Sequence, residues 1–104
     1  MSFLLDTQNE AKLEIAKRLK RLRLYHNWSR ETLALRSGIS PSTLKKFEQT
    51  GDISLERLLK LASALGKMHS FNQLFEIPEA HNSQELKRQE EASERKRGTD
   101  KNEY

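Results

Sequence analysis

Residues 29–47 read S-R-E-T-L-A-L-R-S-G-I-S-P-S-T-L-K-K-F, and this stretch carries the signals of two short helices joined by a tight turn. Ser29 offers a side-chain acceptor for the start of the first helix, and Gly38 is the residue type that ends a helix in the left-handed conformation. Ser40 and Pro41 then form a second helix start, because a proline at the first helical position needs no backbone donor. The stretch therefore predicts a helix, a turn and another helix.

The second of these helices, from residue 40 to about residue 49, has an apolar and a polar side. We expect five apolar residues of the stretch to face inward: Leu33, Ala34, Ile39, Leu44 and Phe47. The outward side then carries Pro41, Ser42, Thr43, Lys45 and Lys46. A helix that starts with small polar residues and continues with paired lysines suits insertion into the major groove of DNA.

Helical signals continue on both sides of this stretch. Thr7 with Glu10 three positions later is a capping-box pattern, and a helix over residues 8–25 should bury Ile15, Leu19 and Leu22. Asn27 suits a left-handed helix end, and the lone Trp28 that follows is expected in the core rather than on a base-stacking surface.

After the second helix, Ser54 predicts the start of an amphipathic helix that Gly66 closes. Its expected core row is Leu55, Leu58, Leu59, Ala62 and Leu65. Ser70 and Gln73 form a further capping-box pattern, which predicts a short fifth helix carrying Phe71, Leu74 and Phe75 before the breaker Pro78.

Composition limits the chain to one hydrophobic core. It has 104 residues, of which 35% are hydrophobic, and a formal net charge of +4. Residues 1–78 hold 13 Lys and Arg against 8 Asp and Glu, whereas residues 79–104 hold 6 against 7. The positive excess therefore belongs to the predicted folded part, as expected of a protein that binds the phosphate backbone.

Several classes of site are excluded by the residues that are missing. The sequence has no cysteine, which rules out disulfides and thiolate zinc sites. Its three histidines and four glycines are scattered, so they predict neither a metal site, nor a catalytic group, nor a phosphate-binding loop. No apolar run is long enough to cross a membrane, so we expect a cytoplasmic protein without cofactors or enzymatic activity.

The ordered set of motifs resembles the Xre family of phage-repressor-like helix-turn-helix proteins. It comprises Leu33-Ala34, Gly38-Ile39-Ser40, Thr43, Glu48 and the leucine-rich residues 55–65, and the resemblance covers about residues 10–77. It implies an all-α, five-helix, lambda-repressor-like domain that binds operators as a homodimer. Each motif alone is weak, but their order and spacing together are specific.

The resemblance also assigns roles to individual residues. It implies a DNA-binding set made of Ser29, Arg30, Ser40, Pro41, Ser42, Thr43, Lys45 and Lys46. Arg30 stands where relatives commonly have a glutamine that contacts phosphate. Pro41 departs from the family, because proline offers only apolar contact where relatives often have a base-reading side chain, so readout shifts to Ser42, Lys45 and Lys46.

The resemblance further implies a partly buried salt bridge between Arg23 and Glu48. This salt bridge would fix the helix over residues 40 to about 49, called the reading helix below, on the rest of the domain. The resemblance also places a dimer interface after the fourth helix. We assign Phe71, Leu74, Phe75 and Ile77 to that interface, and the alternative is that they complete the monomer core.

The expected domain organisation is an N-terminal extension over residues 1–7, a DNA-binding and dimerisation domain over residues 8–78 and a charged, flexible tail over residues 79–104. Residues 83–96 contain many helix formers, so a marginal helix is the alternative to disorder in the tail. In either case this segment is too polar to bury a core of its own.

Three functional hypotheses follow. The first is a dimeric, nucleoid-associated transcriptional repressor that binds double-stranded DNA at an inverted repeat. A finer version is a HipB-like antitoxin that represses its own operon with a HipA-like kinase toxin, which rests on similar size and layout alone. The contrasting hypothesis is a protein-interaction adaptor that keeps the fold but binds little DNA.

Overall fold

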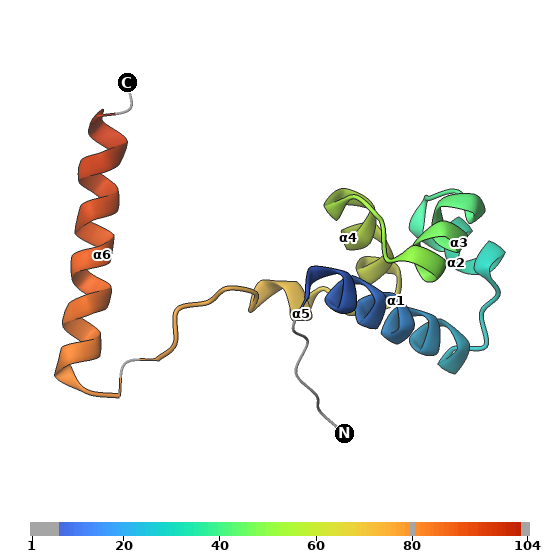
Figure 1. Cartoon of the computed structure of the whole chain (residues 1–104), viewed down its shortest axis with the longest axis horizontal. Coiled ribbons are helices and arrows are strands. Elements are labelled where there is room, and N and C mark those ends of the chain that lie inside the picture. Colours follow the sequence, from blue (N-terminus) through green and yellow to red (C-terminus); the bar gives the residue numbers. More distant parts are fainter. Residues whose placement is uncertain (1–6, 80, 103–104) are drawn as a thin grey trace. The chain divides into compact units, whose positions relative to one another are not determined.

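The computed structural model describes residues 7–79 and 81–102, with side chains described as far as residue 95. It is all-helical over these residues, which confirms the predicted fold class. The helices are α1 (Gln8–Tyr25), α2 (Arg30–Ser37), α3 (Pro41–Thr50), α4 (Leu55–Ala64), α5 (His69–Asn72) and α6 (Ser83–Asn102) (Figure 1). The chain divides into two compact units, residues 1–72 and residues 73–104. The predicted N-terminal extension, apart from Thr7, lies outside the described residues.

The ends of the first three helices have the predicted capping residues. The Thr7 hydroxyl accepts a hydrogen bond from the Glu10 amide at the start of α1, and Asn27 has a φ of 59° just after the helix. Gly38 ends α2 with a φ of 77°, and Ser40 caps α3 with Pro41 at its first position. These residues fix the helix boundaries for two reasons. The capping hydroxyls accept hydrogen bonds from first-turn amides that have no partner within the helix, and a left-handed residue ends the helix.

The core of the first unit lies between α1, α2, α3 and α4. In it α3 packs against α1 and α2, and α2 also packs against α4. The buried cluster consists of Ala16, Leu19, Leu33, Ile39, Leu44, Phe47, Leu61 and Leu65. The five residues of the central stretch predicted to face inward are all buried, as the apolar spacing requires.

One residue in each of the two predicted core rows was wrong, while the other residues of both rows are buried or half-buried. On α1, Ile15 is exposed and its neighbour Ala16 is fully buried. On α4, Leu55 is exposed in the first turn while Leu61 is fully buried. In both helices the apolar residues cover more than one face, so spacing alone did not show which part of the stripe meets the neighbouring helices.

Trp28 is half-buried against the core rather than enclosed by it. The His26 ring stacks on the indole at a centroid distance of 4.8 Å. The Arg36 guanidinium lies 4.4 Å from the centroid of the indole ring. The tryptophan therefore anchors the corner between α1 and α2 through a partly solvent-accessible stack of polar groups.

Gly51 ends α3 in the left-handed conformation at a point of close approach to α1. A Cβ atom on this residue would lie 2.8 Å from the backbone carbonyl carbon of Lys12. The Lys12 ammonium also pairs with the Asp52 carboxylate, and the hydrogen bond from Lys12 lowers the pKa of Asp52. The α3–α4 loop is thus held against α1 by a close backbone contact and an ion pair.

The fifth helix differs from its prediction. It spans only His69–Asn72, so Ser70 lies inside it and does not cap it, and Leu74 and Phe75 follow its end. Phe75 has a φ of 62°, a left-handed conformation that cannot continue a helix. A capping-box pattern was insufficient here because no apolar stripe follows it for more than one turn.

The second unit contains α6, a single continuous helix over Ser83–Asn102 (Figure 1). The Asn82 side chain accepts a hydrogen bond from the Glu85 amide, and the Glu85 carboxylate accepts one from the His81 amide. Of the two alternatives for the tail, the structure has the helix, and the flexibility of this segment stays a prediction. The unit begins after Asn72, six residues before the domain boundary predicted from composition.

Candidate nucleic-acid interface

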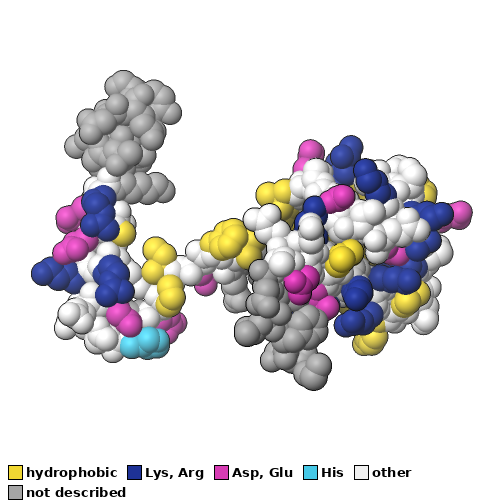
Figure 2. All heavy atoms as spheres, viewed as in Figure 1, with side chains coloured by type: hydrophobic (Ala, Val, Ile, Leu, Met, Phe, Trp, Pro, Cys, Tyr) yellow, Lys and Arg dark blue, Asp and Glu magenta, His cyan; other side chains and the backbone are white. Residues whose placement is uncertain are grey.

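Helix α3 presents a polar face because its apolar residues are taken up by the core. Leu44 and Phe47 are buried, and Pro41, Ser42, Lys45 and Lys46 are exposed while Thr43 is half-buried. The first unit carries Lys and Arg side chains over much of the face shown in Figure 2, with carboxylates among them. The outward side of α3 is therefore free to meet a ligand.

The first turn of α3 contains three hydroxyl groups that hydrogen-bond to one another. The Ser40 Oγ accepts from the Thr43 amide at 3.1 Å and lies 2.7 Å from the Thr43 Oγ1 and 3.2 Å from the Ser42 Oγ. Ser40 is therefore committed to capping the helix, while Ser42 is exposed and does not cap it. The Ser40 hydroxyl is therefore not available for contact with a base edge.

Pro41 lies beside an apolar hollow of about 490 Å³ between α2 and the start of α3. Its lining includes Leu35, which is 85% exposed, and Ile39. The start of the reading helix thus offers apolar surface next to the hydroxyl cluster, in keeping with the apolar contact predicted for Pro41.

The two lysines of α3 are the cations of its outward face. Neither Lys45 nor Lys46 forms a salt bridge with another residue in the part of the chain that the structure describes. Lys46 is near enough to Asp52 to help lower the pKa of that carboxyl. An exposed ammonium without an ion-pair partner is available to a phosphate or a base acceptor.

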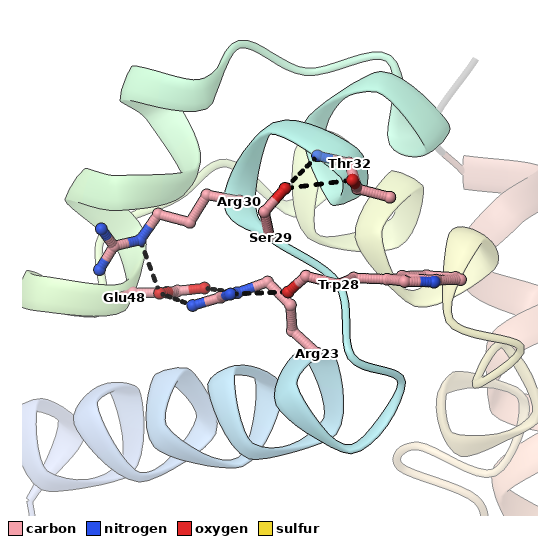
Figure 3. A network of polar contacts seen from close by, with 6 residues as sticks. All are labelled: Arg23, Trp28, Ser29, Arg30, Thr32 and Glu48. Atoms are coloured by element: carbon pink, nitrogen blue, oxygen red, sulfur yellow. Dashed lines mark hydrogen bonds and ion pairs between the residues drawn. The ribbon is translucent and has the colours of Figure 1, made fainter.

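Behind the reading face, Glu48 joins three helices through two arginines (Figure 3). The Arg23 Nε donates to Glu48 Oε2 at 2.8 Å, and the Arg23 Nη2 donates to Oε1 at 3.0 Å. The Arg23 Nη1 also donates to the Trp28 carbonyl at 2.9 Å. The pair implied by the resemblance is thus present, bidentate, and tied to the α1–α2 corner as well.

Arg30 joins the same carboxylate, a contact that the sequence did not indicate. Its Nε donates to Glu48 Oε1 at 3.0 Å, and its side chain is 35% exposed. Burial raises the pKa of Glu48, but the hydrogen bonds and charges of Arg23 and Arg30 outweigh it and hold that pKa below the usual glutamate value. The carboxylate is therefore ionised at neutral pH.

The remaining residue predicted for DNA contact, Ser29, is the N-cap of α2. Its hydroxyl accepts a hydrogen bond from the Thr32 amide at 3.1 Å. It lies next to Arg30 in Figure 3, so the start of α2 and the guanidinium of Arg30 are neighbours. The N-terminus of a helix favours anions, which adds to the positive character of this edge.

One neighbouring feature was missed by the sequence reasoning. A hollow of about 310 Å³ beside α3 is lined by Thr43, Lys46, Asp52, Ile53, Ser54 and Arg57. Ser54 caps α4 there, and Arg57 is exposed in its first turn. The sequence did contain a signal for this feature, because Arg57 stands three residues after Ser54, the cap of the helix that follows the reading helix.

The residues assigned to a dimer interface fall on both sides of the boundary between the units. Phe71 is half-buried in α5 of the first unit. In the second unit Leu74, Phe75 and Ile77 are exposed, Phe75 by 93%. The monomer core of the first unit does not include these three side chains.

Other kinds of site find no support in the described ranges, 7–79 and 81–102. There, no group of three or more histidine and carboxylate residues is placed to hold a metal ion. Nor does any described helix have the length and apolar character needed to cross a bilayer.

The comparison with protein families agrees with this geometry. A family model described as helix-turn-helix matches residues 19–69, which run from the second half of α1 to the start of α5. Searches of curated proteins and of solved structures give no significant match. Residues 19–69 are therefore similar to helix-turn-helix domains, and this similarity supports a DNA-binding regulator of the Xre type.

Proposed function

We propose that this protein is a transcriptional repressor that binds an inverted-repeat operator as a homodimer. The observation that carries the proposal is the outward face of α3, where Ser42, Lys45 and Lys46 are exposed over a buried Leu44 and Phe47. A helix held in this way enters the major groove with its first turns at the base edges. Such a repressor works in the cytoplasm on the nucleoid and needs neither cofactor nor catalysis.

The proposed contacts divide into reading and positioning groups. Ser42, Lys45 and Lys46 lie at base edges, where lysine donates to guanine acceptors, and Pro41 contacts a thymine methyl. Ser29, Arg30 and Thr43 bind phosphate oxygens. Ser40 acts by capping α3. Phosphate contacts supply most of the affinity, so binding should weaken steeply as salt rises.

The decisive experiment replaces both lysines of α3. Lys45→Ala with Lys46→Ala should lower the affinity for a selected operator duplex by about 100-fold. Circular dichroism should show the same thermal midpoint as the wild type, because both side chains are exposed. Lys60→Ala with Lys67→Ala is the matched control, since these exposed lysines lie outside α3. Equal losses in both variants would contradict the proposed interface.

The domain plan belongs to the same proposal. Residues 8–78 bind DNA and dimerise, and residues 79–104 form a charged, flexible tail. Exposed apolar residues in a mainly polar segment favour self-association, and Leu74, Phe75 and Ile77 provide them. Phe75→Ser with Ile77→Ser should convert a dimer to a monomer in sedimentation equilibrium, and an unchanged mass would remove these residues from the interface.

We further propose that the repressor is the antitoxin of a toxin–antitoxin operon, with a HipA-like kinase as its partner. The support is a small DNA-binding domain followed by a short charged segment. Co-expression with the product of the adjacent gene tests this version. A neighbouring protein that neither binds the chain nor strengthens operator binding would refute it.

The alternative is a protein-interaction adaptor with the same fold. The exposed apolar side chains of Leu35, Leu74 and Phe75 favour it, because such surfaces commonly meet proteins. An adaptor should retain its partner binding when Lys45 and Lys46 are replaced. It should also show no sequence preference among duplexes, which distinguishes it from the repressor.

A further inference from the structure

Glu48 connects a buried arginine to a partly exposed one. Its side chain is 1% exposed, that of Arg23 is 7% exposed and that of Arg30 is 35% exposed. The cluster holds one carboxylate and two guanidinium groups, so it carries one net positive charge. Arg30 is its exposed member, and the excess charge therefore faces solvent at the start of α2.

The Arg30 guanidinium contacts Glu48 through one edge only. Its Nε donates to the carboxylate, and Figure 3 shows the two terminal nitrogens pointing away from Glu48. Among the described residues, no group accepts a hydrogen bond from those terminal nitrogens. A guanidinium has five N–H groups, so four of them remain available in a planar fork that matches a phosphate.

We propose that Glu48 is a positioning residue for DNA binding, which holds Arg30 so that its terminal N–H groups bind one phosphate of the backbone. The inference rests on the proposed function and adds a role for Glu48 beyond its pair with Arg23. An unrestrained arginine loses side-chain freedom when it binds, and an arginine already held by a carboxylate loses less. The carboxylate thus raises affinity for a polyanion although its own charge repels one.

A purely structural role for Glu48 makes a different prediction. In that case Glu48→Gln lowers DNA affinity only by loosening α3, and the loss is the same whether or not Arg30 is present. A positioning role requires the loss to depend on Arg30. The double-mutant cycle of Glu48→Gln and Arg30→Ala, measured on DNA affinity, separates the two roles.

The chain offers a matched control pair on α1. The Arg18 Nε donates to Glu14 Oε2 at 2.9 Å, and the side chains of Glu14 and Arg18 are 11% and 66% exposed. This pair also joins a largely buried glutamate to a more exposed arginine through Nε. It lies outside the proposed interface, so Glu14→Gln and Arg18→Ala should leave DNA affinity unchanged.

The experiment uses the full chain and a fluorescent duplex of mixed sequence, roughly 30 base pairs long, at several salt concentrations, because a phosphate contact does not depend on sequence. Circular dichroism gives the folded fraction of each variant, and affinities are expressed per folded protein. Arg30→Ala should weaken binding about tenfold and reduce the salt slope by about 0.9. Glu48→Gln should weaken binding several-fold in the Arg30 protein and clearly less in the Arg30→Ala protein, where only its pair with Arg23 is lost.

Arg30→Lys provides a second test that does not touch the buried pair. A lysine keeps the charge but lacks the planar guanidinium, which contacts Glu48 through Nε and presents its terminal nitrogens to a phosphate. The affinity of Arg30→Lys should therefore lie between those of the wild type and Arg30→Ala, and wild-type affinity would overturn the inference.

The remaining outcomes are equally decisive. Equal effects of Glu48→Gln in both backgrounds, tighter binding by Glu48→Gln, or a comparable loss in the control pair would overturn the positioning role while leaving the repressor intact. Failure of the wild type to bind any duplex in a salt-dependent manner would instead overturn the proposed function, and this inference with it.

Discussion

Helices α3 and α6 are both polar, yet they depend on different interactions. Helix α3 has 10 residues and buries Leu44 and Phe47, whereas α6 has 20 residues and none of its described side chains is fully buried. A short helix is unstable alone, so α3 exists because the core holds it, while α6 relies on intrinsic propensity and its cap. The formation of α3 therefore depends on its packing against the core, whereas the helix-forming residues of α6 are sufficient for α6 to form.

The largest loss of stability should come from removing a buried side chain of α3 from the core. Phe47→Ala removes a side chain that is 1% exposed and should cost about 3–5 kcal/mol of unfolding free energy. Leu86→Ala in α6 removes a half-exposed side chain and should change the urea midpoint of the first unit very little. Similar losses for the two substitutions would show that α6 contributes to the main core after all.

We expect low pH to destabilise the packing of α3 because it protonates Glu48. Because the folded-state pKa of Glu48 is lowered, its ion pair stabilises the protein above the unfolded-state pKa of about 4.3. That contribution is lost as the pH falls through the lower folded-state value. Glu48→Gln leaves Arg23 buried without its charge partner and should cost about 3 kcal/mol at neutral pH.

Urea titrations of the wild type and Glu48→Gln between neutral pH and about pH 3 measure this difference. The gap between the two proteins should narrow as the pH falls, while the helix content of α6 should not follow the same curve. A gap that is constant with pH would contradict the assignment of acid sensitivity to Glu48.

Two glycines next to α3 allow a finer comparison. Gly51 and Gly38 have φ values of 78° and 77°, and alanine is strained at both, by about 1 kcal/mol. Only at Gly51 would the added Cβ meet backbone, at 2.8 Å from the Lys12 carbonyl carbon. Gly51→Ala should therefore lower the thermal midpoint clearly more than Gly38→Ala, and equal shifts would exclude a tight α1–α3 contact.

The smallest effect belongs to the cap of α6. Asn82→Ala removes the acceptor of the Glu85 amide and should reduce the stability of the α6 helix by about 1 kcal/mol. Far-ultraviolet circular dichroism should show a loss of helix with no change in the main unfolding transition. A shift of that transition would mean that the two units unfold together.

The sequence predicted what local chemistry controls and missed what long-range packing controls. The helix boundaries from Thr7 to the start of α3 at Pro41 followed from caps, a glycine and a proline, and the buried side of α3 followed from its spacing. The exposure of Ile15 and Leu55 did not, since it depends on how neighbouring helices meet. The end of α5 was missed because its cap-like pattern lacks a supporting apolar stripe.

The same limit applies to the candidate site. Its outward residues were predictable from one helix, and the Arg23–Glu48 pair was implied by family resemblance. The Arg30–Glu48 contact joins residues 18 positions apart on different helices, and periodicity carries no information about such a pair. The hollow containing Arg57 likewise arises from a loop path that composition does not determine.

The stack around Trp28 has a practical consequence for studying this molecule. The chain has a single tryptophan, so its intrinsic fluorescence comes from one indole at the corner between α1 and α2. That indole belongs to the first compact unit, and its emission should follow the environment of His26 and Arg36 on its ring. The protein thus contains an optical reporter of the unfolding of its helix-turn-helix unit, with no tryptophan background from residues 73–104.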